Sequence, residues 1–347
     1  MKVKEFFEKT KLDNGLLIGF YGGGNYGDEL LLEVIQNLLQ KNKPKNFKIM
    51  YQKPDEFETF HHDFGYERVD AFNKPGLLKA MLKSKTIVIG GGGLWGLDFN
   101  LNVLLMSMAL FFCRLLGKKV YLVGIGYYQS TTQLGHLGAW FAGKAATHII
   151  ARDDETAANF AKITSQKKIS QDVDIAWNLE ESDYKEYVLE KSDLLSGLSI
   201  ANSTTFITLR RFHPGSIKGN AYKQAVENYI NQNQTTPIIL SLMEPASADS
   251  SNFDYIQTLA RNNKNVQAID FSYNPLSLLL FFKKNREKLR IISPQFHVII
   301  TAKLAGVSFF PMAYDNKVDE LLRMMRAEKI HTIENVTVAD LTEFAKT

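Results

Sequence analysis

Two patterns of hydrophobic and polar residues alternate from one end of the chain to the other. Short runs rich in β-branched and aromatic residues predict strands, and the longer stretches between them, with apolar residues every three or four positions, predict helices. This alternation indicates parallel strands joined by right-handed crossovers. In the first half the predicted strands are Leu16–Tyr21, Phe47–Tyr51, Thr86–Ile89, Lys119–Gly124 and His148–Ala151, and the predicted helices are Asp28–Gln40, Gly76–Lys83, Leu101–Leu116 and Gly135–Ala145.

The alternation is interrupted by a polar stretch at residues 180–203 and then resumes. The later predicted strands are Phe206–Leu209, Pro237–Leu242, Val266–Ile269, Leu289–Ile292 and Val307–Pro311, with helices at Ala221–Asn231, Asn252–Asn262, Pro275–Lys284, His297–Leu304 and Lys317–Arg326. We expect two doubly wound, Rossmann-like α/β domains, residues 1–185 and 186–347, and the pattern leaves open whether the last residues pack back on the first domain. Such domains place ligands at the carboxyl ends of their strands, so we expect the site in a cleft between them.

Composition narrows the class of protein. Hydrophobic residues make up 45% of the chain and charged residues 22%, which is typical of a globular protein without long disordered tracts. The net charge is +4, and Lys and Arg are interleaved with acids, so no basic stripe predicts a nucleic-acid partner. The single cysteine, Cys113, cannot form an internal disulfide, which fits a reducing compartment, and we interpret it as a small buried hydrophobe rather than a nucleophile.

The most apolar segment, Leu101–Leu116, contains Arg114 and is followed by Lys118 and Lys119. A membrane-spanning helix needs about 20 apolar residues, so we expect a crossover helix buried inside the protein. Residues 1–14 are charged and lack the apolar core of a signal peptide. We therefore expect a cytoplasmic protein, with peripheral contact at the inner face of the membrane left open.

Three glycine-bearing turns follow predicted strands of the first half. Glycine lets the backbone turn tightly and approach a ligand, and a run of four glycines is costly to order unless it serves binding. Turns at the carboxyl ends of neighbouring parallel strands would line one crevice. The residues concerned are Gly23, Gly24, Asn25, Gly27 and Asp28 in the first turn, Gly91, Gly92 and Gly93 in the second, and Gly124 and Gly126 in the third.

The first turn also matches the dinucleotide fingerprint G-x-G-x-x-G through Gly22, Gly24 and Gly27. That fingerprint requires an acid about 20 residues further on, at the end of the second strand, where this chain has the tetrapeptide MYQK at residues 50–53. The sequence thus disfavours NAD binding. The plainer alternative is a strand-to-helix turn with Asp28 as a carboxylate at the helix start.

Charged residues at other strand ends give further candidates. Arg152 ends a predicted strand, and its guanidinium suits bidentate recognition of phosphate or carboxylate, although an ion pair with Asp153 that fixes the turn is the alternative. We interpret the metal-capable run His61-His62-Asp63 as a solvated turn, because no distant partner is evident. Asp172-Val173-Asp174 resembles a metal-binding D-x-D but lies near the domain boundary, so no metal site is predicted.

Six segments together carry a resemblance to a known family. They are GFYGGGNYGDELLL (residues 19–32), VIGGGGLWG (88–96), GIG (124–126), IIARDDET (149–156), ITLRRF (207–212) and IISPQFHVIITAKLAGVSFFPMAYDNKV (291–318). In this order and spacing the chain resembles the polysaccharide pyruvyl transferase family from about residue 16 to residue 322. The resemblance implies a GT-B-like pair of domains that transfers the enolpyruvyl unit of phosphoenolpyruvate onto two sugar hydroxyls, forming a ketal and releasing phosphate, without a cofactor.

The late segment is similar to the family pattern Ser-x-Arg-x-His followed by Tyr-x-x-Lys, except that Gln295 stands where the family has arginine. By resemblance, His297 is the general acid that protonates the methylene carbon of the donor, and Tyr314 contacts the acceptor. The implied donor-binding residues are Ser293, Gln295 and Lys317, with the strand-end arginines Arg152, Arg210 and Arg211. Glutamine brings no charge, and a charge-assisted hydrogen bond is about twice as strong as a neutral one.

We therefore expect a transferase that uses phosphoenolpyruvate and a glycan, or a nucleotide- or lipid-linked sugar, as acceptor in cell-surface polysaccharide synthesis. The replacement at Gln295 keeps two alternatives open. One is a GT-B glycosyltransferase that uses a nucleotide sugar, and the other is a relative that binds glycans or nucleotides without catalysis.

Overall fold

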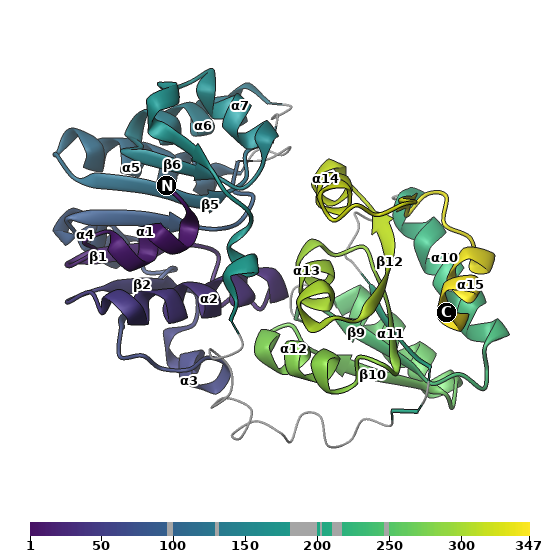
Figure 1. The fold of residues 1–347 in the computed structure, drawn as a ribbon. Helices are drawn as coiled ribbons and strands as arrows, with labels where there is room; N and C mark the ends of the chain where they lie inside the picture. The colour runs from purple at the N-terminus through teal and green to yellow at the C-terminus, as the bar shows by residue number, and fades with distance from the viewer. Residues whose placement is uncertain (96–99, 129–131, 181–199, 202, 210–216, 246–249) are drawn as a thin grey trace. The chain divides into compact units, whose positions relative to one another are not determined.

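The computed structural model describes residues 1–95, 100–128, 132–180, 200–201, 203–209, 217–245 and 250–347 (Figure 1). The chain divides into two compact units, one made of Met1–Gly23 and Asp28–Asp183 and the other of Gly24–Gly27 and Tyr184–Thr347. The predicted boundary at 185 and most of the polar stretch at 180–203 lie outside the described residues.

The first unit is built on a seven-stranded sheet in the order β3-β2-β1-β4-β5-β6-β7. All of its described strand pairs are parallel. The strands are β1 (Gly15–Ile18), β2 (Lys48–Tyr51), β3 (Glu67–Asp70), β4 (Thr86–Gly90), β5 (Lys119–Ile125), β6 (His148–Ala151) and β7 (Ile169–Gln171). The helices are α1 (Val3–Lys9), α2 (Tyr26–Asn42), α3 (Phe57–Phe60), α4 (Lys74–Lys83), α5 (Leu101–Leu115), α6 (Gln133–Ala145) and α7 (Asp154–Ala161), with short 3-10 turns η1 (Pro54–Glu56), η2 (Gln166–Lys168) and η3 (Ile175–Asn178).

Alternate strand residues of this sheet face different helices. One core combines Leu16, Ile87 and Leu122 of the strands with Leu77 of α4 and Leu110 of α5, and it continues into α6 and α7. On the opposite face, Phe6 of α1 packs against the Tyr121 ring at 4.9 Å between centroids. The period of two along each strand therefore places α4 to α7 on one face and α1 on the other.

The second unit has a six-stranded sheet in the order β10-β9-β8-β11-β12-β13, again parallel throughout its described pairs. Its strands are β8 (Thr204–Leu209), β9 (Ile238–Leu242), β10 (Val266–Asp270), β11 (Leu289–Ser293), β12 (Ser308–Ala313) and β13 (His331–Thr332). Its helices are α10 (Ile217–Gln232), α11 (Ser250–Asn262), α12 (Pro275–Lys284), α13 (Phe296–Ala305), α14 (Asn316–Met324) and α15 (Val338–Lys346). Both sheets thus share one topology, and the prediction of two doubly wound α/β domains is confirmed.

The C-terminal helix belongs to the second unit. Leu341 of α15 is part of the core that also contains Ile207 of β8 and Tyr222 of α10. The sequence left open a return of the last residues to the first domain, but the apolar face of α15 is used within its own unit.

Helix α5 differs from its prediction. Its bounds match, but only Ser107, Leu110 and Cys113 are buried, so the expectation of a helix enclosed by protein is wrong. Cys113 is the buried small residue that the sequence suggested, and burial raises the pKa of its thiol. In the described ranges no helix combines the length and apolar character needed to cross a bilayer.

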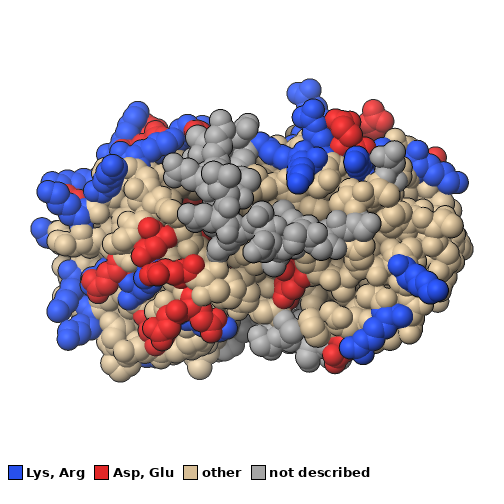
Figure 2. Space-filling view, turned by 90° about the horizontal axis from the view of Figure 1, so that it is seen from below, with Lys and Arg blue, Asp and Glu red and all other residues tan. Residues whose placement is uncertain are grey.

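Charge is mixed on the face of the molecule that Figure 2 presents. Blue Lys and Arg side chains are scattered there among red Asp and Glu side chains and tan residues. The described residues on this face form no continuous basic surface of the kind that binds a nucleic-acid backbone.

Candidate functional site

The glycine turns of the first unit lie at the point where its strand order reverses. Neighbouring strands β1 and β4 are followed by chain segments that depart in opposite directions, and open α/β sheets bind ligands at such a point. Gly22, Gly91 and Gly92 have φ of 80°, 71° and 83°, a region that strongly favours glycine. The Gly22 N–H donates to the Glu29 carboxylate at 2.9 Å, which fixes the first turn.

Close packing explains other glycines of these turns. A Cβ on Gly23 would lie 2.9 Å from the Gln52 side chain, and one on Gly124 would lie 2.3 Å from Ile175. Gly92 is near Asp28, whose Oδ1 would be 3.6 Å from an added Cβ. The turns are therefore shaped by their protein neighbours, and ligand contact at them stays a prediction.

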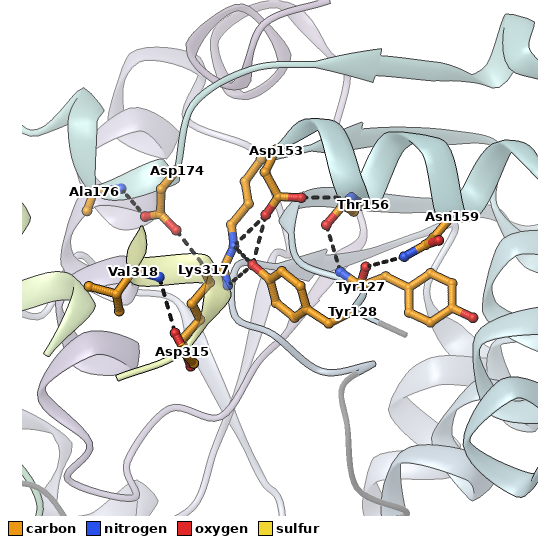
Figure 3. Close-up of polar contacts among 11 residues, drawn as sticks. Tyr127, Tyr128, Asp153, Thr156, Asn159, Asp174, Ala176, Asp315, Lys317 and Val318 are labelled. Atoms are coloured by element: carbon orange, nitrogen blue, oxygen red, sulfur yellow. Dashed lines mark hydrogen bonds and ion pairs between the residues drawn. The ribbon is translucent and has the colours of Figure 1, made fainter. Parts of the chain in front are cut away.

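Arg152 follows β6 directly and is buried in a polar network. Figure 3 labels Tyr128, Asp153 and Asp174, which belong to this network. Its guanidinium donates to Asp174 at 3.2 Å and to the Tyr128 hydroxyl at 2.8 Å. Tyr128 in turn donates to Asp153 at 2.8 Å, and Asp153 caps α7 by accepting from the Thr156 N–H. Burial by itself would lower the pKa of Arg152, but Tyr128 and the carboxylates raise it, so the guanidinium stays charged.

This network combines the two interpretations of Arg152 made from the sequence. The ion pair with Asp153 is present at 3.6 Å, and Asp174 supplies a second carboxylate. Asp174 also caps η3, while Asp172 accepts from the Val3 N–H at 2.7 Å, so both carboxylates of the D-x-D have protein partners. Donor binding by Arg152 stays a prediction, and it would compete with these partners.

Gly126 is the position where the network leaves least space. A Cβ there would lie 2.9 Å from Nη2 of Arg152, whereas one on Gly93 would lie 3.5 Å from the same atom, an ordinary contact. We expect Gly126→Ala to lower the free energy of unfolding by about 1–3 kcal/mol, because the Arg152 guanidinium must shift away from the methyl group and thereby strain its hydrogen bonds to Asp174 and Tyr128. Urea denaturation measures this, with Gly93→Ala as the matched control. Equal effects of the two substitutions would contradict the explanation.

A buried charge cluster behind the first turn was missed from the sequence. The His61 ring lies between two carboxylates of α2, with Nε2 at 2.9 Å from Glu29 and Nδ1 at 2.6 Å from Glu33. All three side chains are at most 1% exposed, so the predicted solvated turn is wrong at His61. Burial lowers the pKa of His61, but the hydrogen bonds to both carboxylates outweigh it and raise the pKa to about 9. The His61 imidazolium therefore neutralises the Glu29 carboxylate, which accepts the hydrogen bond from the Gly22 N–H.

The second unit has its own point of strand-order reversal, between β8 and β11. Ser293 ends β11, and its hydroxyl is 2.6 Å from that of Thr208 on β8. Ser293 also accepts from the Gln295 N–H at 3.1 Å, which shapes the turn into α13. His297 is the second residue of α13 and therefore lies in the first turn of the helix, whose N–H groups are not part of its i to i−4 hydrogen-bond ladder. Arg210 and Arg211, which follow β8, lie outside the described residues.

The tetrapeptide Gly24–Gly27 belongs to the second unit, although it follows β1 in sequence and its last two residues begin α2, which otherwise belongs to the first unit. The Tyr26 N–H donates to the Met243 carbonyl at 2.9 Å, and its hydroxyl is 2.6 Å from Thr301 Oγ1, which donates to the His297 carbonyl. A Cβ on Gly27 would lie only 2.1 Å from Nδ1 of His297. Gly27 is thus a glycine because the imidazole occupies the space of a side chain.

The remaining predicted residues of the second unit lie near the start of α14. The Lys317 ammonium is 3.4 Å from Asp315 and 5.3 Å from the centre of the Tyr314 ring. Asp315 caps α14 by accepting from the Val318 N–H (Figure 3). Among the described residues, Oε1 of Gln295 is buried without a hydrogen-bond partner.

The family can now be assigned. A model of the polysaccharide pyruvyl transferase family matches residues 25–316, which includes Asn25, Tyr26 and Gly27 of the tetrapeptide and the His297 turn. The chain belongs to the polysaccharide pyruvyl transferase family. A search of curated protein sequences found no match to this pyruvyl transferase family member.

Solved structures support the architecture of this family member. It is similar to UDP-N-acetylglucosamine 2-epimerase of Neisseria meningitidis bound to UDP-GlcNAc, with a TM-score of 0.58 at 12% identity over 100% of this chain and 91% of that one. The corresponding enzyme of Rickettsia bellii gives 0.59 at 10% identity, covering 96% and 86%. The wall teichoic acid polymerase TagF gives 0.55 at 12% identity, covering 99% and 83%. These similarities show the fold alone, which is that of GT-B enzymes.

Proposed function

We propose that this protein transfers a pyruvyl group from phosphoenolpyruvate onto two hydroxyls of a sugar in a cell-surface polysaccharide or its precursor. One observation carries the proposal: within the segment matched by the family, Gly27 leaves space for the imidazole of His297 at the start of α13. A histidine placed this tightly at a helix start, beside the reversal point of a doubly wound sheet, is suited to acid catalysis on an anionic substrate.

The proposed reaction consumes both hydroxyl protons of the sugar. His297 would donate a proton to the methylene carbon of phosphoenolpyruvate, turning it into a methyl group, while the first hydroxyl bonds to the adjacent carbon. Cleavage of the carbon–oxygen bond to phosphate and attack by the second hydroxyl close the ketal. One hydroxyl proton replaces the proton lost by His297, and the other leaves with inorganic phosphate, so the acid is restored after each turnover.

Binding of the donor would use the anion-binding capacity around α13. Phosphoenolpyruvate carries a phosphate and a carboxylate, and the N–H groups in the first turn of a helix favour such anions. Gln295, at the cap of this helix, offers an uncharged amide where the family has arginine. Lys317 supplies a partly exposed ammonium, which Asp315 partly neutralises. We therefore expect weaker donor binding than an arginine at position 295 would give.

The test is release of inorganic phosphate from phosphoenolpyruvate in the presence of a panel of nucleotide-linked, lipid-linked and free glycan acceptors. Acceptor-dependent release, with a mass gain of the acceptor equal to a pyruvate ketal, would support the proposal. Gln295→Arg is expected to lower the KM for phosphoenolpyruvate by about tenfold, since it restores a charge-assisted contact.

A second candidate function follows from the structural neighbours, one of which is described in complex with UDP-GlcNAc. If no phosphate is released and sugar is instead transferred from a nucleotide donor, this chain is a GT-B glycosyltransferase. If neither reaction occurs while a glycan or nucleotide binds, the chain is a binding protein of the same fold.

A further inference from the structure

We propose that the outer face of α4, α5 and α6 docks onto the surface of a membrane that carries anionic lipid headgroups. This α4–α6 face consists of eleven exposed large apolar side chains, out of fifteen in the described residues. They are Leu78, Leu82, Leu101, Leu105, Met108, Phe112, Leu115, Leu116, Leu134, Leu137 and Trp140. The inference does not depend on the proposed pyruvyl transfer.

The apolar residues form stripes along helices that already have a buried side. On α5 the exposed residues Leu101, Leu105, Met108, Phe112 and Leu115 recur every three or four positions and are 44–69% exposed. This spacing places them on one side of the helix. The opposite side already packs on the sheet, so the stripe is not needed for the core of the unit.

The three helices bring their stripes together. Helix α5 packs against both α6 and α4. The ring of Phe111 is 6.0 Å from that of Trp140 on α6, and Lys118, after α5, donates to the Leu82 carbonyl at the end of α4. Monomeric soluble proteins rarely expose so many contiguous apolar side chains, so such a surface indicates an interaction site.

The charge of the segment that carries the α4–α6 face indicates that its binding partner is anionic. From residue 74 to residue 151 the described residues include no Asp or Glu, and the one acid of this stretch, Asp98, lies outside them. The same stretch carries eight basic residues: Lys74, Lys79, Lys83, Lys85, Arg114, Lys118, Lys119 and Lys144. Lysines around an apolar face are attracted to anionic headgroups.

A second copy of the chain fits the face poorly, because two such faces would bring lysines together without acids to pair with them. An anionic membrane surface matches both the apolar side chains and the lysines of this face. The apolar side chains would enter the boundary of the acyl chains, and the lysines would stay among the headgroups. Trp140 suits this boundary, being 40% exposed with the Lys144 ammonium 5.8 Å from its ring centre.

The test is co-sedimentation of the full chain with phosphatidylcholine vesicles, with and without phosphatidylglycerol. We expect binding to the vesicles that contain phosphatidylglycerol, weakened by added salt. Leu105→Glu and Phe112→Glu should each reduce partitioning by at least about tenfold, because burial of one such side chain contributes about 1.5–3 kcal/mol. Met324→Glu, at a residue of similar exposure (52%) on α14, is the matched control and should bind as wild type.

A second measurement introduces no charge among the apolar side chains of the α4–α6 face. Vesicle binding should shift the fluorescence of Trp140 to shorter wavelength, and Trp140→Phe should remove that shift while sedimentation with vesicles persists. The double variant Lys79→Glu/Lys83→Glu should bind the anionic vesicles at least about tenfold more weakly.

Several results would overturn the proposal. They are no binding to either vesicle, equal binding to both, or a lipid-free dimer that Leu105→Glu converts to a monomer. The last of these would assign the face to contact between copies of the chain.

Discussion

Replacement of His297 by alanine is expected to slow acceptor-dependent phosphate release by a factor of about 10²–10⁴, the usual contribution of a positioned general acid. The imidazole of His297 lies against Gly27 at the start of α13. Steady-state kinetics with phosphoenolpyruvate and an active acceptor measure the effect. We expect the loss mainly in kcat, because the acid acts in the transition state rather than in binding.

His62→Ala is the matched control, since His62 is an exposed histidine outside the proposed site. Gly27→Ala tests the same acid without removing it, because its methyl group must displace the imidazole. A misplacement of about 1 Å can cost about a hundredfold in rate, so this variant should lose activity. The added methyl group is also expected to lower the free energy of unfolding by about 1–3 kcal/mol, because it overpacks the turn. If His297→Ala keeps more than a third of wild-type kcat, His297 is not the acid.

The second large effect is expected on stability. Replacing His61 by alanine should lower the free energy of unfolding by about 3–5 kcal/mol, because Glu29 and Glu33 then remain buried side by side without the cation between them. Urea denaturation at neutral pH measures the loss. His62→Ala is again the control, with an expected change below about 0.5 kcal/mol at an exposed position. A loss of the same size in both variants would contradict the role of the buried cluster.

The same cluster predicts a dependence of stability on pH. The pKa of His61 is about 9 in the folded protein, whereas an unperturbed histidine, as in the unfolded chain, has a pKa of about 6.5, so the proton is bound more tightly when the chain is folded. Its contribution is therefore fully present below about pH 6.5 and is lost as the pH rises through about 9, a difference of about 3 kcal/mol. Besides Glu29 and Glu33, the aromatic rings of Tyr51 and Phe57 face the imidazole. His61→Gln should lose this part of the pH dependence, and an unchanged slope in that variant would contradict the assignment.

Most of the fold could be predicted from the sequence because its central strands are buried on both faces. Runs such as Thr86–Ile89 and Phe206–Leu209 are apolar or β-branched throughout, which is how parallel strands covered by helices appear. The missed strands lie at sheet edges, where the signal is weak. β3 is the segment ERVD with one buried residue, β7 has none, and β13 has two residues.

The chemistry of the first turn was harder to predict because it depends on contacts across the sequence. Nothing local to His61 shows that its partners are Glu29 and Glu33, 32 and 28 residues earlier. A signal did exist in α2, where two acids one turn apart lie within the apolar run ELLLEVI at residues 29–35. Acids inside such a run are expected to have a buried partner.

The reason for glycine at position 27 could not be predicted from the sequence either. Its place in a glycine-rich turn suggested that the backbone needs the conformational freedom of glycine there. In the structure, however, Gly27, Gly93 and Gly126 do not have a positive φ. The reason for glycine at position 27 is a ring 270 residues later, which only the folded chain brings near. The position of His297 after the end of β11 was predictable, because the alternation of strands and helices along the sequence is sufficient to place it there. Its catalytic role stays a prediction.

Because Gly24–Gly27 belongs to the second unit, the linker is a poor point at which to divide the chain into fragments or to exchange domains. A fragment that begins at the linker would contain α13 and His297 but not Gly27 or the hydrogen bonds of Tyr26. The His297 side chain of such a fragment would therefore lack its contact with Gly27. Exchange of whole domains between relatives, by recombination at the linker, would separate residues that must fit each other within tenths of an ångström. We expect the two halves of such genes to be inherited together, and functional chimeras to require that the tetrapeptide travel with the second half.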